Sequence, residues 1–467
     1  MPRASSSTRP PSAAGCGPSS SPAWRPWRPG WARSSSPGPA ATPPSCRTGS
    51  EGRTLSRRDP LPDLSPKAVE ARDAAFVLGT YARTPFHPRG GRGARLVDAD
   101  GKVYWDLLAG IAVNALGCRH PRLVKALREE AVHPLHVSNL FHHPWQGLLA
   151  EKLVSASGMA RAFFCNSGTE ANEAAIKLCR LRTPGRHGLV ALHGSFHGRT
   201  AGAVSITGNP PYYEPFQPLL PGVTFVPPDD AAALEAAVTE ETSAVFLEPI
   251  QGEGGIVPLA REFVARAREA CDRVGASLVL DEIQCGLGRT GALFPFRELG
   301  VRPDVVTLAK PLGGGLPLGA VLVSAEVASL VKPGMHGTTF GGNPVACRLG
   351  FELLSEIEER GLLARVASLG EWFGRRLAAL KRRCPAVVAV RGTGLIWGIE
   401  LDREAGPVAR ALLGKGFVVG TARKAVLRLL PPYVVPKAAL AAFTVALEEV
   451  LREGAPAPAE AGKKEEP

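Results

Sequence analysis

Helix-like and strand-like runs alternate along the chain from Pro121 to about Met335, and this alternation limits the possible folds more than any other feature. The strand-like runs are short and apolar, for example LVALHG, TSAVFLEP, SLVLDE and DVVTLAK. Longer helix-like runs such as ANEAAIKLCRLR and REFVARAREACDRVG stand among them. Strands that alternate with helices form a mostly parallel sheet with helices on both of its faces. We therefore expect an α/β fold, with a large domain over residues 121–335.

The regions on either side of this domain have a different pattern. Residues 65–120 begin with a helix-like run and continue with a predicted hairpin around Asp100 and Gly101. A long amphipathic helix is expected after Pro344, and the strand-like runs VVAVRGTGLIWGIEL, GFVVG and VLRLLPPYVV follow it. The sequence predicts a smaller α+β domain over residues 336–453, which the N-terminal segment 65–120 joins.

The two ends of the chain lack the aliphatic residues that a core requires. Residues 1–64 are rich in Arg, Ser and Pro, and residues 454–467 form a charged tail, so we expect both to be disordered. An Arg-rich, acid-poor leader is typical of an organelle transit peptide, but its frequent prolines argue against the amphipathic helix that such a leader needs. A start codon assigned too far upstream is the alternative explanation.

The net charge of +12 is concentrated in this leader. Residues 1–60 hold nine Arg against Glu51 and Asp59, which accounts for +7 of the total. The remaining charge is ordinary, so we expect no nucleic-acid partner for the folded part. A rival hypothesis is a binding protein whose Arg/Trp-rich leader contacts single strands while the body is catalytically idle.

Several classes of protein are excluded by simple counts. No apolar run reaches the roughly 18 residues of a membrane-spanning helix, so we expect no membrane role. The nine cysteines show neither C-x-x-C pairs nor metal-ligand spacing with histidine, so we expect no metal site. A cytoplasmic location is the default for such a chain.

Two predicted strands end in residues that suit one cofactor. The apolar run from Ser277 delivers Asp281 at its end, and the run from Val305 delivers Lys310 just before a triple glycine. In open α/β sheets, ligands bind outside the carboxyl ends of the strands. A lysine that binds an aldehyde covalently, with a carboxylate that keeps a ring nitrogen protonated, is what a pyridoxal phosphate site requires.

The run CNSGTEANEAAIKL joins a predicted strand to a predicted helix. The free N–H groups and the dipole of such a helix suit a phosphate dianion near Gly168 and Thr169. The alternative is a plain capping box between Ser167 and Glu170, and both can hold together.

Three further loops carry polar groups that are ambiguous when each is taken alone. In FHGR, Phe196 can stack on a flat ring and Arg199 can bind a carboxylate, although an isolated turn of this kind is commonly plain surface. In EPIQGEGG, Glu253 can pair with an arginine or remain solvated. In HGTTFGGNP, the hydroxyls of Thr338 and Thr339 suit phosphate contact or simple turn chemistry.

Taken together, the motifs NSGTEANE, FHGR, EPIQGEGG, LDEIQCGLGRTG, LAKPLGGG and HGTTFGGNP, in this order and spacing, resemble the class III pyridoxal phosphate aminotransferases. The resemblance covers about residues 70–452 and implies the fold-type I architecture, with a seven-stranded, mostly parallel sheet in the large domain. It also implies a homodimer whose active sites are shared between the subunits. Under the rival hypothesis of a binding protein, a folded part without catalytic activity would carry this set of motifs only by chance.

The resemblance implies a role for individual residues. Lys310 and Asp281 would be catalytic, with Asp281 paired to the cofactor's ring nitrogen. The remaining cofactor contacts would come from Gly168, Thr169, Phe196, Gln284 and Thr339. The substrate contacts would come from Arg199, Thr338, Glu253, Arg428 and Ile111.

The implied reaction is transfer of the terminal amino group of N-acetylornithine to 2-oxoglutarate in arginine biosynthesis. The alternatives use the same chemistry on ornithine, succinylornithine, 4-aminobutyrate or a carrier-bound lysine precursor. Family members that act on ornithine have a tyrosine where this chain has Ile111, and an acylated nitrogen favours an apolar neighbour. Similar sequences often have Ser-Thr-Tyr in place of Thr338, Thr339 and Phe340, and a histidine in place of Cys118, which concerns substrate selection more than phosphate binding.

Overall fold

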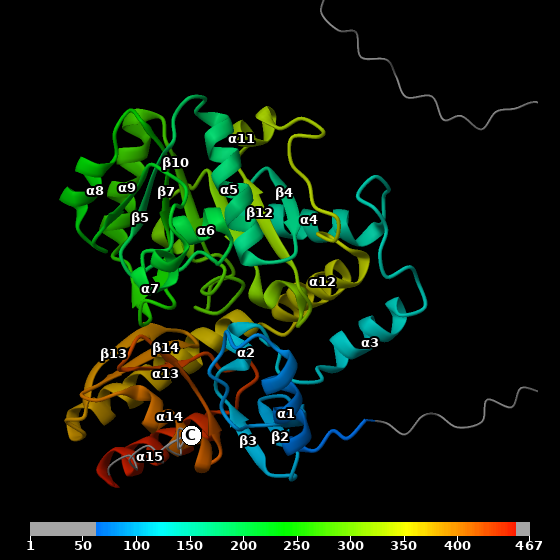
Figure 1. Cartoon of the computed structure of the whole chain (residues 1–467), viewed down its shortest axis with the longest axis vertical. Coiled ribbons are helices and arrows are strands. Elements are labelled where there is room, and N and C mark those ends of the chain that lie inside the picture. Colours follow the sequence, from blue (N-terminus) through cyan, green and yellow to red (C-terminus); the bar gives the residue numbers. More distant parts are fainter. Residues whose placement is uncertain (1–61, 454–467) are drawn as a thin grey trace, which may run out of the picture. The chain divides into compact units, whose positions relative to one another are not determined.

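The predicted mostly parallel sheet is present in the computed structural model of the chain, which describes residues 62–453 (Figure 1). Its seven strands lie in the order β4-β12-β11-β10-β7-β5-β6. Only the two pairings made by β12 are antiparallel, and the fold-class prediction is therefore confirmed. The strands are β4 (Arg161–Cys165), β5 (Gly188–Leu192), β6 (Val223–Val226), β7 (Thr242–Leu247), β10 (Ser277–Asp281), β11 (Val305–Leu308) and β12 (Gly319–Val323).

Apolar residues fill both faces of this sheet because side chains alternate along each strand. Phe246 and Val279 belong to the core on the face covered by α5, whereas Leu247 and Leu280 belong to the core on the face covered by α9. Strands buried on both faces read as continuous apolar runs, which is why they were recognisable in the sequence. The helices of this part are α3 (Pro121–Glu130), α4 (Pro144–Ser157), α5 (Gly168–Arg182), α6 (Ala201–Ser205), α7 (Pro210–Tyr213), α8 (Ala231–Ala237), α9 (Arg261–Val274), α10 (Pro295–Leu299) and α11 (Ala325–Leu330).

The connections at the carboxyl ends of the strands build the loops that matter for function. β7 leads into the small hairpin of β8 (Ile250–Gln251) and β9 (Val257–Pro258). β10 and β11 pair in parallel, with Asp281 opposite Thr307, so both strands deliver their last residues to the same edge. The short 3₁₀ helix η2 (Lys310–Gly313) follows β11 after one residue, Ala309.

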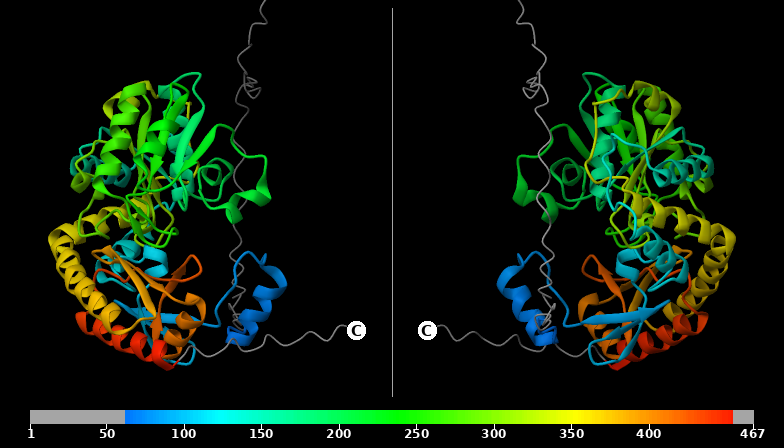
Figure 2. Two further views of the ribbon diagram at one scale, coloured as in Figure 1. Left: turned by 90° about the vertical axis from the view of Figure 1, so that its left-hand side faces the viewer. Right: turned by 90° about the vertical axis from the view of Figure 1, so that its right-hand side faces the viewer.

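A second, antiparallel sheet is formed by the C-terminal part, in the order β13-β14-β17-β16. Helices α13 and α15 lie together against it and close a large apolar core around Phe373, Phe443 and Leu447 (Figure 2). The elements of this part are α12 (Pro344–Glu359), α13 (Leu362–Arg383), β13 (Val387–Thr393), β14 (Ile396–Leu401), α14 (Ala405–Gly414), β15 (Phe417–Val418), β16 (Gly420–Ala422), β17 (Val426–Leu429) and α15 (Lys437–Glu453). The short 3₁₀ helix η1 (Glu214–Phe216) belongs to the part with the large sheet, where it follows α7.

The N-terminal segment is tied to the C-terminal part by a strand pairing. β3 lies beside β15 in parallel, with Trp105 opposite Phe417, and extends the sheet β1-β2-β3-β15. The hairpin predicted around the D-G turn is β2 followed by β3. The bounds are α1 (Pro66–Phe76), β1 (Pro88–Arg92), β2 (Arg95–Asp98), β3 (Val103–Asp106) and α2 (Ala109–Ala112).

The predicted disordered leader, apart from its last three residues, and the predicted tail lie outside the described residues. None of the helices within residues 62–453 is both long and apolar enough to cross a membrane.

Candidate active site

A cavity of about 460 Å³ lies at the carboxyl edge of the large sheet. Its size is within the usual range for small-molecule sites. Residues from segments far apart in the sequence meet here, because parallel strands bring their ends to one edge. The predicted site residues that line it are Gly168, Thr169, Phe196, Arg199, Asp281, Gln284 and Lys310.

Lys310 occupies the second position after β11, in an unusual backbone conformation. Its φ is 44°, in the left-handed region that residues with a side chain seldom adopt. Such strain persists where the surrounding structure holds it, and it is common at functional sites. Burial lowers the pKa of Lys310, while the carboxylate of Asp281 opposes this effect. A lysine of this kind has an increased share of neutral, nucleophilic amine.

Asp281 ends β10 and is fixed by three hydrogen bonds. Oδ2 accepts from Asn172 Nδ2 at 2.8 Å and lies 2.8 Å from His197 Nδ1, while Oδ1 accepts from the backbone N–H of Ile283 at 3.0 Å. Asn172 and His197 are fully or almost fully buried. Burial opposes protonation of His197, but the hydrogen bond with Asp281 and the negative charges of Asp281 and Glu248 together outweigh it and raise the pKa of the imidazole. The carboxylate is therefore held in one orientation.

Glu248 lies beneath the loops that border the cavity. Its two carboxyl oxygens accept the backbone N–H groups of Phe196, at 2.9 Å, and Gly252, at 3.0 Å. This carboxyl group therefore links the FHGR turn to the QGEGG loop. Burial raises the pKa of Glu248 to about 7, and the neighbouring His197 opposes the rise.

The N-terminus of α5 borders the cavity, as the NSGTE motif predicts. Ser167 Oγ accepts the N–H of Glu170 at 3.3 Å, and Glu170 Oε2 accepts the N–H of Asn166 at 2.6 Å. This capping leaves the first-turn N–H groups of Gly168 and Thr169 without an intrahelical partner. The Thr169 hydroxyl is already engaged, since Oγ1 lies 2.8 Å from the hydroxyl of Thr200.

The cavity can be tested for its fit to pyridoxal phosphate. A Cβ on Gly168 would lie 2.7 Å from Ile283 Cδ1, so only glycine leaves Ile283 its place in the cavity wall. Gln284 Oε1 is buried and has no hydrogen-bond partner among the described residues. A helix N-terminus for the phosphate, a carboxylate for the ring nitrogen and a lysine for the aldehyde complete the set. The residues present therefore fit this cofactor.

Arg199 is exposed at the cavity and carries an uncompensated charge. None of the carboxylates in residues 62–453 forms an ion pair with it. Its guanidinium group lies instead over the ring of Tyr212, with Cζ 3.8 Å from the ring centroid. Its edges are thus available to an anionic ligand.

Glu253 and Arg428 form an ion pair between the loop after β8 and strand β17. The Arg428 side chain is 5% exposed and that of Glu253 is 21% exposed. The charges of both residues influence the pKa of Lys310, which places the pair close to the lysine although it is not part of the cavity lining.

Five predicted site residues do not line this cavity: Glu253 and Arg428, described above, and Thr338, Thr339 and Ile111. Thr338 Oγ1 accepts a hydrogen bond from Asn166 Nδ2 at 3.2 Å, and Thr339 is exposed. Ile111 is 37% exposed and has a φ of 61°, which is rare for a β-branched residue.

Sequence reasoning missed Asn172 and Tyr212, and it gave His197 no role. Asn172 lies one turn into α5, where its position after the NSGTE motif was a weak signal for the site. Tyr212 belongs to a P-P-Y-Y run that has no recognisable binding pattern.

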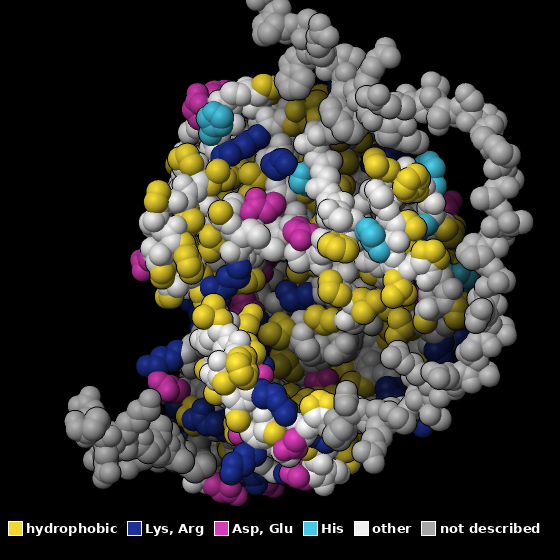
Figure 3. Space-filling view, turned by 45° about the vertical axis from the view of Figure 1, so that its right-hand side comes forward, with side chains coloured by type: hydrophobic (Ala, Val, Ile, Leu, Met, Phe, Trp, Pro, Cys, Tyr) yellow, Lys and Arg dark blue, Asp and Glu magenta, His cyan; other side chains and the backbone are white. Residues whose placement is uncertain are grey.

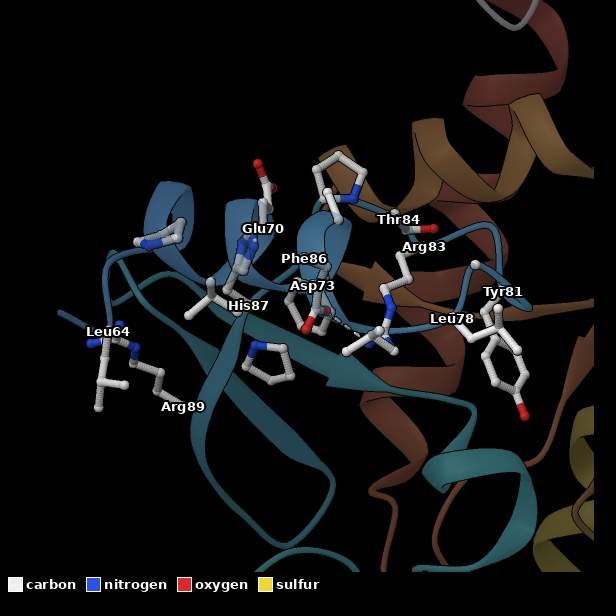
Figure 4. Close-up of a pocket in the computed structure, with 17 residues that line it drawn as sticks. Leu64, Glu70, Asp73, Leu78, Tyr81, Arg83, Thr84, Phe86, His87 and Arg89 are labelled. Carbon is white, nitrogen blue, oxygen red and sulfur yellow. Dashed lines mark ion pairs between the residues drawn. The ribbon is translucent and has the colours of Figure 1, made fainter. Parts of the chain in front are cut away.

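A second cavity, of about 620 Å³, lies beside α1 (Figure 4). Two ion pairs lie in it, Arg83 with Asp73 at 3.1 Å and His87 with Glu70 at 3.2 Å, whereas Arg89 forms no ion pair with another described residue. The residues that line it in the described part of the chain include no lysine. Although it is larger than the cavity at Lys310, its chemistry does not suit catalysis.

A lysine and a fixed carboxylate on neighbouring parallel strand ends, beside a helix N-terminus, define an enzyme that uses pyridoxal phosphate. Residues 80–451 match the family described as aminotransferase class III, and the chain belongs to that family. It is therefore a pyridoxal phosphate-dependent aminotransferase.

Individual relatives agree with this assignment. The chain is 46% identical to an acetylornithine aminotransferase from Mycolicibacterium smegmatis, over 82% of this chain and 98% of the relative. A solved N-acetylornithine aminotransferase from Stenotrophomonas maltophilia has a TM-score of 0.70 and 36% identity, covering 80% of this chain and 97% of that one. A solved ornithine aminotransferase from Toxoplasma gondii, with pyridoxal phosphate partially occupying its active site, has a TM-score of 0.80 and 32% identity, covering 83% and 94%.

Proposed function

We propose that this enzyme transfers the terminal amino group of N-acetylornithine to 2-oxoglutarate, giving N-acetylglutamate semialdehyde and glutamate, in arginine biosynthesis. One observation carries the class of amino donor: Arg199 has no carboxylate partner within residues 62–453, whereas Arg428 is paired with Glu253. The site therefore presents one free guanidinium group, which suits a donor with a single carboxylate far from its reacting amine. The acetylornithine aminotransferases among the relatives support the same substrate.

The proposal gives each cofactor-binding residue a role that agrees with its position in the cavity. Bound pyridoxal phosphate supplies a carbonyl group and an electron-accepting ring for exchange of the amino group. Asp281, held by Asn172 and His197, keeps the ring nitrogen protonated, and Lys310 binds the aldehyde. Gly168 and Thr169 offer backbone N–H groups to the phosphate. Phe196 would cover one face of the ring, and Gln284 would approach its phenolic oxygen, since both line the cavity.

Lys310 also moves a proton. Once its Nζ is free, it takes a proton from the Cδ atom of the donor and returns one to the acceptor carbon in the second half-reaction. The lowered pKa of this lysine favours the neutral amine that a base requires. The charge of Arg199 holds the α-carboxylate of the donor, and Ile111 adjoins its acylated nitrogen.

The proposal includes a homodimer with shared active sites. Thr338 and Thr339 then contact the substrate and the cofactor phosphate of the other subunit, which agrees with their position outside the Lys310 cavity of their own chain. Residues 121–335 form the cofactor-binding domain, and residues 336–453 with 65–120 form the small domain, supported by the pairing of β3 with β15. Seven cysteines of the described residues are free thiols, which favours the cytoplasm.

A panel of amino donors tests the substrate. With 2-oxoglutarate as acceptor, we expect kcat/KM for N-acetylornithine to exceed that for ornithine and 4-aminobutyrate by at least about tenfold. The apolar Ile111 suits an acylated nitrogen better than the charged α-amino group of ornithine, and 4-aminobutyrate has no such nitrogen. Succinylornithine is the close competitor, because it has the same α-carboxylate and an acylated nitrogen. A higher value for ornithine or 4-aminobutyrate would contradict the proposal.

Borohydride reduction followed by peptide mapping tests the lysine. We expect the cofactor to be attached to Lys310 alone, and Lys310→Ala to lose turnover while it still binds the cofactor through Gly168, Thr169 and Asp281. A label on any other lysine would exclude the assignment.

A further inference from the structure

The guanidinium group of Arg199 lies against two aromatic side chains, Tyr212 and Phe196, which we call the aromatic platform. Its Cζ lies 3.8 Å from the centroid of the Tyr212 ring and 5.6 Å from that of Phe196. The two rings meet edge to face, with centroids 5.7 Å apart and an interplanar angle of 86°. The guanidinium group therefore lies in a corner formed by two aromatic side chains, of which Tyr212 is much the nearer.

The platform itself is anchored to the large sheet. Tyr212 belongs to the short helix α7, whose start is braced by the bond from Tyr212 N–H to the backbone oxygen of Asn209 at 2.9 Å. The next residue, Tyr213, stacks on Phe225 of strand β6 at 5.9 Å and an interplanar angle of 14°. One tyrosine of the pair thus holds α7 in place, and the other supports the arginine.

The backbone of Arg199 is fixed from the opposite side. Its N–H donates to Thr169 Oγ1 at 3.2 Å, at the start of α5. The long side chain would still lose much rotamer freedom on binding a ligand. An aromatic ring over one face of the guanidinium group removes part of that loss before the ligand arrives.

The stacking leaves the binding edges free. A ring contacts the flat face of a guanidinium group, while a carboxylate binds in its plane through two N–H groups. Both contacts can therefore be made at once. Arg199 has no acidic partner within residues 62–453, so its edges remain available.

We propose that Tyr212 is a positioning residue that makes this enzyme selective for amino donors that carry a carboxylate, by holding Arg199 in its binding orientation. This inference rests on the proposed role of Arg199 as the site of the donor carboxylate. It adds a specificity residue from α7, a segment that contributes nothing to the lining of the Lys310 cavity.

Two substrates that differ only in the carboxylate give the test. N-Acetylputrescine is N-acetylornithine with a hydrogen atom in place of the α-carboxylate. The measured quantity is the ratio of kcat/KM for N-acetylornithine to kcat/KM for N-acetylputrescine, since general loss of activity or stability cancels in it. We expect Tyr212→Leu to lower this ratio about tenfold, mainly through KM, and Tyr212→Phe to retain it within about twofold.

Tyr213→Leu is the matched control. It removes a tyrosine from the same helix, but one that stacks on Phe225 rather than on Arg199. We expect it to lower the melting temperature and to leave the ratio at the wild-type value. An equal fall in the ratio would show that any damage to α7 has the same effect, and would overturn the proposal.

A double substitution separates positioning from direct contact. In an Arg199→Gln background, Tyr212→Leu should change the ratio no further, because Tyr212 acts through the arginine. A further fall in the ratio, or a fall in Tyr212→Phe as large as in Tyr212→Leu, would mean that the tyrosine contacts the substrate itself. Calorimetric titration of the holoenzyme with glutarate, an unreactive dicarboxylate, should show the same order of affinities without turnover.

The experiment distinguishes an error in the proposed substrate from an error in the role of Tyr212. If ornithine is the better donor, the pair ornithine and putrescine gives the same ratio and the same comparison of variants. If the wild-type enzyme does not prefer the carboxylated member of either pair, Arg199 is not the carboxylate site and the inference is wrong. If the preference exists but Tyr212→Leu leaves it intact, only the inference is wrong.

Discussion

At the scale of single residues, we propose that the pair of Glu253 and Arg428 allows one pocket to accept two unlike substrates. Glutamate brings an extra carboxylate close to the cofactor, whereas N-acetylornithine does not. Arg428 is almost fully buried, and an unpaired charge in such a position is costly. We therefore expect Glu253 to neutralise Arg428 during the first half-reaction and to release it during the second.

Half-reaction kinetics test this switch. Glu253→Ala should favour glutamate over N-acetylornithine, because Arg428 is then free throughout. Arg428→Ala should slow the glutamate half-reaction selectively, by about a hundredfold, since it removes the buried cation that pairs with the extra carboxylate of glutamate. Arg383→Ala serves as a control, because it breaks a remote ion pair of the same domain, with Glu448 at 2.7 Å. If both site variants slow the two half-reactions equally and lower thermal stability, the pair is a fixed bridge between the domains.

The sequence predicted the site residues at or just after the end of a strand, because the end of a parallel strand indicates their place at the carboxyl edge of the sheet. Lys310 and Asp281 each follow an apolar run, and parallel strands bring such ends together. The contacts of Asn172 and His197 with Asp281 join residues 109 and 84 positions apart. No local pattern encodes such contacts, so they became visible only in the folded chain.

At the scale of elements, the start of α5 combines a structural and a binding role. Gly168→Ala should weaken cofactor binding by about tenfold or more, because its Cβ would lie 2.7 Å from Ile283 Cδ1 and push that side chain out of the cavity wall. Gly147→Ala, in α4, is the matched control, since a Cβ there meets nothing within 4 Å. It should raise stability by up to about 1 kcal/mol through helix propensity and leave the cofactor affinity unchanged. Spectroscopic titration with pyridoxal phosphate measures both affinities, and equal affinities in the two variants would contradict this role of Gly168.

The least predictable element was β12, the single antiparallel strand of the large sheet. Its sequence, GAVLV, follows the glycine-rich run LGGGLPLG so closely that the local pattern reads as an extension of the loop. The strand enters the sheet between β11 and β4 by long-range pairing. The hydrophobic periodicity and the strand propensities of the sequence therefore predicted the parallel strands β5, β7, β10 and β11 better than they predicted β12.

At the scale of the whole molecule, one of the apolar surfaces of the described residues lies beside Thr338. The segment after α3 and the loop before α12 are joined by hydrogen bonds from Asn139 Nδ2 to the backbone oxygens of Thr338 and Gly341, both at 3.0 Å. Hydrophobic side chains are exposed on the face shown in Figure 3. We define the Thr338 surface by the exposed residues Leu135, Leu140, Phe141, Met335 and Phe340.

The final prediction is that a second copy of the chain covers the Thr338 surface and that activity depends on it. Leu140 is 87% exposed and Phe141 is 67% exposed, which is unusual for neighbouring large apolar side chains of a stable monomer. The double substitution of Leu140 and Phe141 by Asp should weaken the dimer by placing unpaired charges in the interface. Val445→Asp, which alters a 48% exposed residue of α15, should leave it intact. Sedimentation velocity over a range of concentrations, with specific activity measured on the same samples, should show activity falling with the dimer fraction, because Thr338 and Thr339 then no longer reach the other subunit's site. A monomer with full specific activity would show that each chain carries a complete active site.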